Sequence, residues 1–317
     1  MDVVPDSRAF PLLGWCVCPA CHGALAAAMG AIACTSCGDV YPVNERGQPD
    51  LRPRRSLQRT LAFCVPLPGE PAPALAAADV APAHDCDWDY RAYPIHPLWR
   101  SGNHLNAALL SHIPKARANG RLLEIGCGWH PVRELAAHLG YRYAGIDYAG
   151  PAATLLADAH ALPFEAGGAD VVVSFAVLEH LRHPFAALEE IARALKPGGT
   201  FVGTVAFLEP FHLDSHFHCT HLGTRNLLES AGLEVRTLAP TPEWPGLSAL
   251  AKMGLFPHAP KVLSEAFVLP VAALHRLWWM LGALVDRRPA TSERQRRTTN
   301  AGGFRFVARK PVRASRS

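Results

Sequence analysis

The sequence has few charged side chains and few aromatic ones: 18% of its 317 residues are Asp, Glu, Lys or Arg, and 8% are Phe, Trp or Tyr. Hydrophobic residues make up 49%. This composition excludes wholesale disorder and is typical of a globular protein with a packed core. A chain of this length holds one large domain and a small one, because domains usually run ~100 to 200 residues.

The first residues, MDVVPDSRAFPLLGW, have neither a basic cluster nor a long apolar stretch. The features of a secretory signal peptide are therefore lacking there. The nine cysteines are an odd number, and four of them form two C-x-x-C pairs, which indicates metal binding in a reducing compartment rather than disulfides. We therefore expect a cytoplasmic protein.

A long apolar run without charge is also lacking. Residues 266–285 have the length of a membrane span, but Arg276 lies at the middle and Pro270 interrupts the run. A central Arg alone costs ~2.5 to 3.5 kcal/mol on insertion. The segment predicts instead a buried helix or one that contacts a membrane surface, with Trp278 and Trp279 as anchors.

The net charge of +4 arises in the last part of the chain, where residues 286–317 hold ten Lys or Arg and two Asp or Glu. Such a basic tail can contact the phosphates of nucleic acid or of a membrane. Most charge runs are simply solvated, and we favour that interpretation.

Three regions differ in composition. Residues 12–53 are rich in cysteine and turn residues, residues 54–90 are rich in Pro and Ala and predict a linker, and residues 91–317 alternate between helical and strand patterns. Within the last region, residues 241–300 look like an insertion. Alternating strands and helices predict an α/β fold, a parallel sheet with helices on both faces.

The expected elements follow from apolar periodicity and turn residues. An amphipathic run at 96–113 precedes the first strand. Strands are predicted at 121–125, 142–146, 155–157, 170–174, 200–206, 233–238 and 304–308, and helices at 132–139, 185–195 and 224–231.

The first strand of the sheet runs into a glycine turn, LLEIGCG, in which Glu124 precedes Gly126 and Gly128. In an open α/β sheet a ligand binds at the carboxyl ends of the strands, where glycines let it approach the backbone. Asp147 ends the second strand, 21 residues beyond Gly126. A carboxylate at this place can accept both hydroxyls of a ribose.

A third glycine is missing from this turn. A dinucleotide fingerprint requires G-x-G-x-x-G, and the last position here is Pro131, which argues against a nicotinamide cofactor. Glu124 would repel a pyrophosphate but attract a ligand that carries sulfonium and ammonium charges. The turn therefore predicts a site for a cationic ligand.

Five segments, LLEIGCG, YAGIDY, ADAHALPF, DVVVSFAVLEHL and EEIARALKPGG, resemble in order the motifs of class I S-adenosylmethionine-dependent methyltransferases. The resemblance covers roughly residues 95–240 and the last strand. It implies a Rossmann-like sheet and S-adenosylmethionine as cofactor. By this resemblance, the residues that bind the methionine end, the ribose and the adenine edge of the cofactor are Glu124, Gly126, Cys127, Gly128, Asp147, Tyr148, Asp158, Ala159 and Phe175.

Two features depart from the family pattern. His130 stands where the family often has a third glycine. Only the seven residues 148–154 separate the second and third strands, too few for the usual helix. We therefore expect one flank of the adenosine site to be open.

Methyl transfer is an in-line displacement, so catalysis depends on holding the acceptor behind the methyl group. A hydroxyl acceptor also needs a base, and the candidates are His180 after the fourth strand and His212 or His216 after the fifth. Two alternatives remain open. His180 packs its helix, or Asp214, His216 and His218 alternate on one face and bind a metal.

Cys18-Pro-Ala-Cys21 and Cys34-Thr-Ser-Cys37 are separated by twelve residues, a spacing that brings four thiolates around Zn²⁺. The segment resembles the small zinc-ribbon activator subunit of several methyltransferases. It is too small for a core of its own, so metal binding would supply its folding free energy, and we expect a structural role.

The segment HLDSHFHCTHLGTRNLLESAGLEV is similar to a stretch of methyltransferases from polysaccharide and secondary-metabolite pathways. We therefore expect O-methylation of a small hydroxylated metabolite or glycan precursor. One alternative is an RNA methyltransferase that uses the ribbon and the basic tail, although the ribbon lacks the aromatic and basic surface of nucleic-acid readers. Another is a non-catalytic scaffold, against which the intact Glu124, Asp147 and Asp158 argue.

Overall fold

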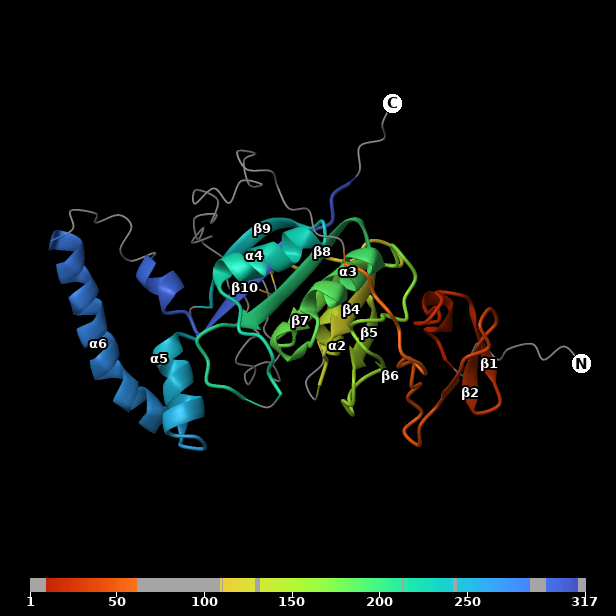
Figure 1. The fold of residues 1–317 in the computed structure, drawn as a ribbon, viewed down its shortest axis with the longest axis horizontal. Coiled ribbons are helices and arrows are strands. Elements are labelled where there is room, and N and C mark those ends of the chain that lie inside the picture. The colour runs from red at the N-terminus through yellow and green to blue at the C-terminus, as the bar shows by residue number, and fades with distance from the viewer. Residues whose placement is uncertain are drawn as a thin grey trace, which may run out of the picture.

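The structure is a computed structural model that describes residues 10–61, 109, 111–128, 132–212, 214–241, 244–285 and 295–312. These residues form a large sheet flanked by helices, with a small sheet at one end of the molecule and a long helix at the other (Figure 1). Most of the predicted linker, most of the amphipathic run at 96–113, and His130 and Pro131 lie outside the described residues.

Seven strands form the large sheet in the order β6-β5-β4-β7-β8-β10-β9. The strands β6, β5, β4, β7 and β8 are parallel, and β10 runs antiparallel to both of its neighbours. The predicted Rossmann-like α/β class is confirmed. The bounds are β4 Arg121–Ile125, β5 Arg142–Asp147, β6 Leu155–Leu156, β7 Ala169–Phe175, β8 Leu195–Ala206, β9 Glu234–Pro240 and β10 Gly303–Arg309.

Helices cover both faces of the sheet: α2 (Arg133–His138) lies on one face, and α3 (Pro184–Ala194) and α4 (His221–Ser230) on the other. Alternate residues of a strand point to opposite faces. Leu122 of β4 accordingly packs in the cluster that contains α2, whereas Leu123 packs with α3 and α4. Both faces are buried, which explains the apolar runs in these strands.

One predicted boundary differs from the structure in an informative way. Strand β8 begins at Leu195 and not at Thr200, because Leu195 already pairs with Ala169 of β7. The register then shifts before Thr200 pairs with Val171, and Gly198, with a φ of 79°, lies in the irregular stretch between the two pairs. The connection between β5 and β6 contains no helix, as its length predicted.

The small N-terminal sheet consists of β1 (Leu25–Ala28), β2 (Ala31–Cys34) and β3 (Val40–Pro42), all antiparallel, after a 3-10 turn η1 (Leu13–Trp15). We call residues 10–53 the ribbon. The ribbon has no separate core: its buried residues belong to the same apolar cluster as the α3 and α4 face of the large sheet. Its elements therefore fold onto the sheet.

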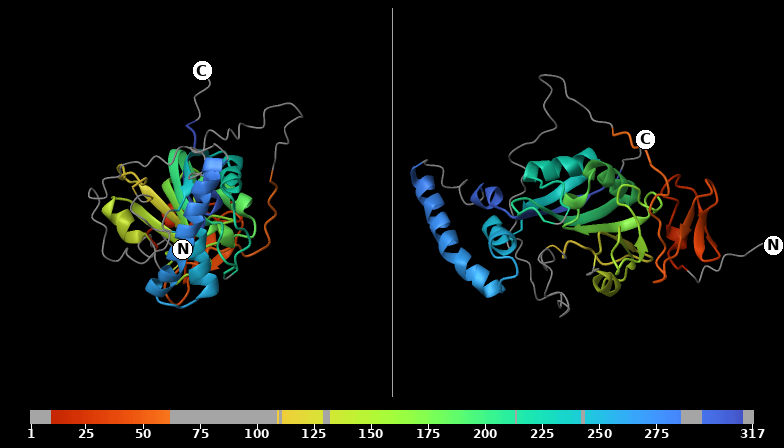
Figure 2. Two further views of the ribbon diagram at one scale, coloured as in Figure 1. Left: turned by 90° about the vertical axis from the view of Figure 1, so that its left-hand side faces the viewer. Right: turned by 60° about the horizontal axis from the view of Figure 1, so that its bottom comes forward.

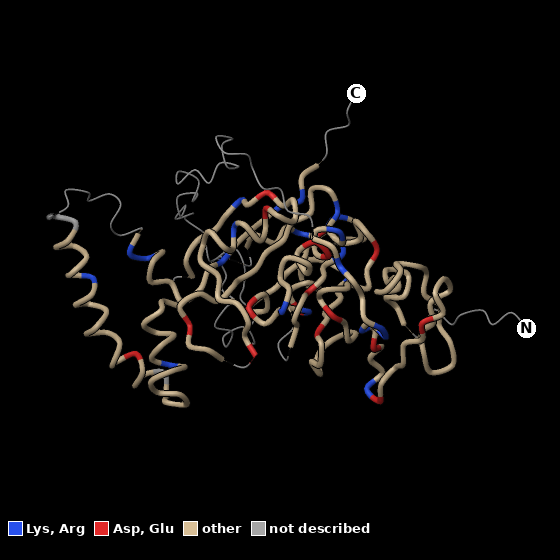
Figure 3. The backbone as a smooth tube through the Cα atoms, viewed as in Figure 1, with Lys and Arg blue, Asp and Glu red and all other residues tan. Residues whose placement is uncertain are grey.

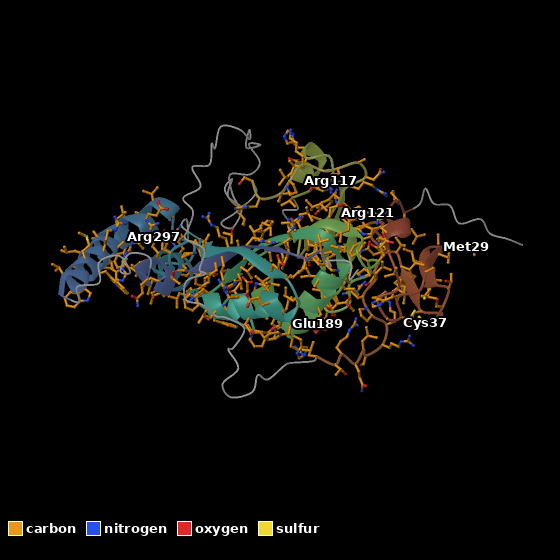
Figure 4. The ribbon with its side chains drawn as sticks, turned by 90° about the horizontal axis from the view of Figure 1, so that it is seen from above. Met29, Cys37, Arg117, Arg121, Glu189 and Arg297 are labelled. Atoms are coloured by element: carbon orange, nitrogen blue, oxygen red, sulfur yellow. The ribbon has the colours of Figure 1, made fainter. Side chains whose placement is uncertain are left out.

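Trp15 is the main apolar anchor of the ribbon. Its ring centroid lies 4.9 Å from that of Phe164, and the guanidinium of Arg121 lies over its ring at 5.5 Å. Figure 4 shows Arg121 at this junction, with Cys37 and Met29 farther out in the ribbon. The anchor places the ribbon beside the segment between β6 and β7.

The end of the ribbon extends the large sheet. The N–H of Leu51 donates to Leu156 O at 2.8 Å, and the N–H of Leu156 donates to Pro49 O at 2.9 Å. Asp50 thereby forms a parallel bridge with Leu156 of the edge strand β6. The ribbon therefore covers an edge that would otherwise expose unpaired backbone groups.

Two polar side chains of the ribbon hold the β5–β6 connection. The Gln48 amide donates to Ala153 O at 2.7 Å and to Pro151 O at 3.2 Å. The Arg52 guanidinium donates to Tyr148 O at 3.2 Å and lies 4.9 Å from the centre of the Tyr148 ring. The flank that we expected to be open is thus occupied by the ribbon, because the missing helix leaves room for it.

The predicted insertion forms α5 (Gly246–Ala249), a π-helical turn η4 (Leu250–Leu255) and the long helix α6 (Lys261–Val285). Helix α6 continues through Pro270 and stands at the end of the molecule opposite the ribbon (Figure 2). Few charged residues lie along it (Figure 3). Its exposed large apolar side chains are Val262, Leu263, Phe267, Leu269, Val271, Leu274, Leu277, Trp278, Met280 and Leu281.

In the part of the chain that is described, none of the helices combines the length and the apolar character that a crossing of a bilayer requires.

Candidate functional site

The glycine turn after β4 forms the centre of the candidate site. Gly126 and Gly128 adopt φ values of 69° and 50°, in the left-handed region that favours glycine. A Cβ at Gly126 would lie 2.3 Å from a methyl carbon of Val177, so a side chain is excluded there. The N–H groups of Gly126 and Cys127 donate to Ile146 O at 2.9 and 3.0 Å, which holds the turn against the end of β5.

The Asp147 carboxylate joins this turn to the β5–β6 connection. Its Oδ2 accepts from the N–H of Gly128 at 2.9 Å, and its Oδ1 accepts from Ala149 at 3.0 Å and Gly150 at 2.8 Å. A carboxylate offers about four acceptor positions, so capacity remains for a further donor. Asp147 therefore fixes both sides of the place where the ribose is predicted, and its contact with a ribose stays a prediction.

Glu124 is almost fully buried, at 3% exposure, and it organises the start of α2. Its Oε2 accepts from the N–H of Val132 at 2.7 Å and from the Tyr143 hydroxyl at 2.5 Å. Burial raises the pKa of Glu124 to about 7, although both hydrogen bonds oppose the shift. The sequence analysis did not predict that Glu124 organises the start of a helix. The available signal was that the helix predicted at 132–139 begins eight residues after Glu124. Its placement at the methionine end stays a prediction.

Asp158 lies beside Asp147 at the end of the next strand, because the N–H of Ala157 donates to Asp147 O at 3.0 Å. The Asp158 Oδ1 contacts Nδ1 of His160 at 2.6 Å and accepts from its backbone N–H at 2.9 Å. Burial opposes ionisation, but these contacts hold the pKa of Asp158 below its ordinary value. His160 also accepts from the N–H of His183 at the start of α3, a link that the sequence analysis missed.

The remaining predicted cofactor residues border this region in different ways. Cys127 is buried, and burial raises the pKa of its thiol to about 12, so it is a neutral packing group. Ala159 is buried, Phe175 is half-buried at the end of β7, and Tyr148 is exposed beneath Arg52. Their contact with a cofactor stays a prediction.

The candidate bases lie at the ends of β7 and β8. His180 ends the 3-10 turn η3 (Leu178–His180), and its ring centroid lies 5.2 Å from that of His212. The Oδ1 of Asp214 lies 3.3 Å from Nδ1 of His180. Burial and the neighbouring His212 hold the pKa of His180 below its ordinary value, so the ring is neutral near pH 7.

The structure groups these residues differently from the sequence prediction. His216 is exposed, and its backbone N–H donates to Glu179 O at 2.6 Å. Among the described residues, Asp214, His216 and His218 do not converge on one point. The convergent group is Glu179, His180 and His212, because the segment after β8 folds back on η3 and does not run extended. The sequence analysis passed over Glu179.

The four ribbon cysteines converge as their spacing predicted. The Sγ atoms of Cys18 and Cys37 are 3.7 Å apart, those of Cys21 and Cys34 are 3.5 Å apart, and all four lie within 4.8 Å of one another. Tetrahedral Zn²⁺ with Zn–S bonds of ~2.3 Å places sulfurs ~3.8 Å apart. The donor set therefore fits Zn²⁺.

Backbone N–H groups point at these sulfurs. The N–H groups of Ser36 and Cys37 lie 3.4 Å from Sγ of Cys34, and that of Gly23 lies 3.4 Å from Sγ of Cys21. Burial would raise the pKa of Cys34, but the N–H groups of Ser36 and Cys37 and the neighbouring thiols of Cys21 and Cys37 lower it to about 6. A thiolate is the form that binds metal, so the surroundings of Cys34 favour its ligation.

Replacement of Cys34 and Cys37 by Ser should remove about one zinc per chain. The same variant should also lower the unfolding temperature of the whole chain, since the ribbon shares the core of the sheet. Metal analysis and thermal unfolding measure both effects. Cys219→Ser, outside the ribbon, is the matched control; equal zinc in the two variants would contradict the site.

Glu124→Gln should flatten the dependence of stability on pH. The pKa of Glu124 is about 7 in the folded chain against 4.5 ordinarily. The folded state thus keeps a proton that the unfolded state releases. The stabilisation that results is complete below pH 4.5 and is lost as the pH rises to 7. Between pH 5 and pH 8, the free energy of unfolding measured with urea should fall by up to ~3 kcal/mol more for the parent than for the variant. Parallel curves for the two proteins would refute the assignment.

Comparison with known proteins gives a consistent family. Residues 98–223 match a family model described as a methyltransferase domain. The chain is 33% identical over 147 residues to a probable S-adenosylmethionine-dependent methyltransferase of Mycolicibacterium smegmatis, over 38% of this chain and 54% of that protein. It is 31% identical over 139 residues to a ubiquinone biosynthesis O-methyltransferase of Xanthomonas campestris pv. campestris, over 38% of this chain and 55% of that protein.

The chain thus spans about half the length of the curated relatives it matches. Among solved structures, it is similar to phosphoethanolamine N-methyltransferase 2 of Haemonchus contortus in complex with S-adenosyl-L-methionine. The TM-score is 0.43 and the identity 18%, over 64% of this chain and 51% of that chain.

The matched range begins after the ribbon and ends before α5. Within it, the first four motifs lie at the ends of β4, β5, β6 and β7, and the fifth covers the end of α3 and the start of β8. These strands form a sheet of order β6-β5-β4-β7-β8, completed by the antiparallel β10. Residues 98–223 are thus similar to the methyltransferase domain, and similar proteins include S-adenosylmethionine-dependent methyltransferases.

Proposed function

We propose that this chain transfers the methyl group of S-adenosylmethionine to a hydroxyl oxygen of a small metabolite or glycan precursor. The observation that carries the proposal is the series of functional groups along neighbouring strand ends. The glycine turn follows β4, Asp147 ends β5 and Asp158 follows β6. When bound, S-adenosylmethionine supplies an electrophilic methyl group on a positively charged sulfur.

The cofactor would lie across the ends of β6, β5 and β4. Gly126 and Gly128 allow close approach of its methionine part, and the carboxylates of Asp147 and Asp158 would accept from the ribose and the adenine. The ribbon supports this side: Gln48 holds the connection that carries Gly150, which is one of the donors to Asp147. We therefore propose a structural role for Zn²⁺ in the ribbon.

The acceptor would lie over the ends of β7 and β8. A hydroxyl needs to lose its proton during transfer, and the neutral His180 and the neighbouring His212 are the groups suited to promote this. The proximity of Asp214 to His180 would stabilise the charge that develops on the ring. Several relatives are named ubiquinone biosynthesis O-methyltransferase, which also favours an oxygen acceptor.

Asp147→Ala should weaken S-adenosylmethionine binding by about 1 to 3 kcal/mol, because buried donors would lose their partner. Isothermal titration calorimetry measures the affinity. Glu189→Ala, which removes an exposed carboxylate on α3 (Figure 4), is the matched control and should bind like the parent. Equal affinity of the Asp147 variant and the parent would exclude the assigned site.

The acceptor class is tested by transfer of a labelled methyl group to a panel of catechols, phenols, sugars and amines. We expect label in oxygen-linked products. His180→Asn should lower kcat by about 10²- to 10⁴-fold while cofactor affinity is retained. Label found only in amine products, or undiminished turnover by the variant, would contradict the proposal.

A further inference from the structure

Glu179 carries a fully buried carboxyl group to which no described residue donates a hydrogen bond. Its side chain is 0% exposed, and neither carboxylate oxygen meets a donor among the described residues. Buried polar groups are almost always hydrogen-bonded, so a buried carboxyl group without a donor is an exception that needs an explanation. Such a group is typical of a site that takes a ligand.

Two imidazole nitrogens near this group are also buried. The Nδ1 of His180 has only the exposed carboxylate of Asp214 near it, at 3.3 Å, and the Nε2 of His218 makes no hydrogen bond within the described part of the chain. One ligand atom from each of Glu179, His180 and His212 lies within 4.8 Å of the other two. The His218 ring centroid lies 5.8 Å from that of His212. Side chains that can bind a metal ion therefore converge from the two segments that follow β7 and β8.

The backbone holds this arrangement in place. After β7, Ala176 adopts a φ of 54°, and its N–H donates to the Thr204 hydroxyl at 3.0 Å, which turns the chain into η3. The N–H groups of His216 and Phe217 donate to Glu179 O at 2.6 and 3.1 Å. The two loops are thus joined by main-chain hydrogen bonds at Glu179 itself, so its side chain is preorganised.

We propose that Glu179, His180 and His212 bind a divalent transition-metal ion, with His218 as a further ligand. Metal bonds of ~2.0 to 2.2 Å place two ligand atoms up to ~4 Å apart, and small side-chain rotations bring the present spacing to that value. Two imidazoles with one carboxylate suit Mn²⁺, Fe²⁺, Co²⁺ or Zn²⁺. Ca²⁺ and Mg²⁺ prefer sites built from oxygen ligands.

The position indicates a role, which rests on the proposed function. The site lies past the ends of β7 and β8, beside the proposed cofactor crevice. With a metal ion bound, His180 and His212 would act as its ligands and not as bases, and the cation instead would lower the pKa of the acceptor hydroxyl. The hydroxyl proton leaves to water beside Asp214, which is 83% exposed. The oxygen pair then forms the bond to the methyl carbon, and the pair of the broken C–S bond returns to sulfur.

Titration with Mn²⁺ tests the site directly, without cofactor or acceptor. The full chain is used with its ribbon saturated with zinc, since thiolates favour Zn²⁺ over Mn²⁺. Electron paramagnetic resonance of free Mn²⁺ measures binding. The parent should bind about one Mn²⁺, and Glu179→Gln and His212→Asn should bind at least ~10-fold more weakly. The control His138→Asn, an exposed histidine on α2, should bind like the parent.

Thermal unfolding shows whether the variants are folded. Mn²⁺ should raise the unfolding temperature of the parent and of His138→Asn and leave that of Glu179→Gln unchanged, because a ligand stabilises only the fold that binds it. Burial raises the pKa of Glu179 to about 8, so the group is mostly neutral near pH 7, and Glu179→Gln keeps its size and shape; the variant should therefore fold. Equal Mn²⁺ affinity in all four proteins, or no binding by the parent at millimolar Mn²⁺, would overturn the proposal.

The methyl-transfer assay tests whether the metal ion takes part in the reaction, independently of whether it binds. Activity that falls on chelation and returns with Mn²⁺ supports the role, whereas activity indifferent to chelation in a chain that binds Mn²⁺ overturns the role alone. Failure to bind S-adenosylmethionine, with Mn²⁺ bound as expected, overturns the proposed function and leaves the metal site intact.

Discussion

The Asp147 carboxylate is the contact on which the candidate site depends. It accepts three backbone N–H groups, one from the glycine turn and two from the β5–β6 connection. Neither segment has regular structure of its own, so this carboxylate fixes their separation. Gln48 of the ribbon holds the far end of the same connection. The ribbon and the turn are therefore coupled through one short loop, and a metal ion bound by the distant cysteines would stabilise the edge of the proposed crevice.

The two halves of the sheet edge differ in how their polar groups are satisfied. On the side of β6, β5 and β4, the carboxylates of Glu124, Asp147 and Asp158 all have hydrogen-bond partners within the protein. On the side of β7 and β8, the buried Glu179 carboxylate has none among the described residues. The first half is built to keep its shape, and the second half has free electron pairs for a ligand. This contrast supports the proposed division into a half that binds the cofactor and a half that carries the chemistry.

The sheet, the glycine turn and the cysteine site followed from the sequence because each depends on local periodicity or on a fixed short spacing. The contact of Gln48 with Ala153 joins residues 105 positions apart, and no local pattern marks it. The burial of Glu179 was not predicted either, because the sequence VLEH does not show that the loop after β8 covers this side chain. The missing helix was predictable from length alone, but its replacement by the ribbon required the tertiary structure.

Amide hydrogen exchange with and without S-adenosylmethionine tests the central claim most directly. If the junction at Asp147 holds the cofactor, exchange should slow at the amides of Gly128, Ala149 and Gly150, while the amides of α6 stay unchanged. Unchanged exchange at these three amides under saturating cofactor, or protection confined to the ribbon or to α6, would contradict the account.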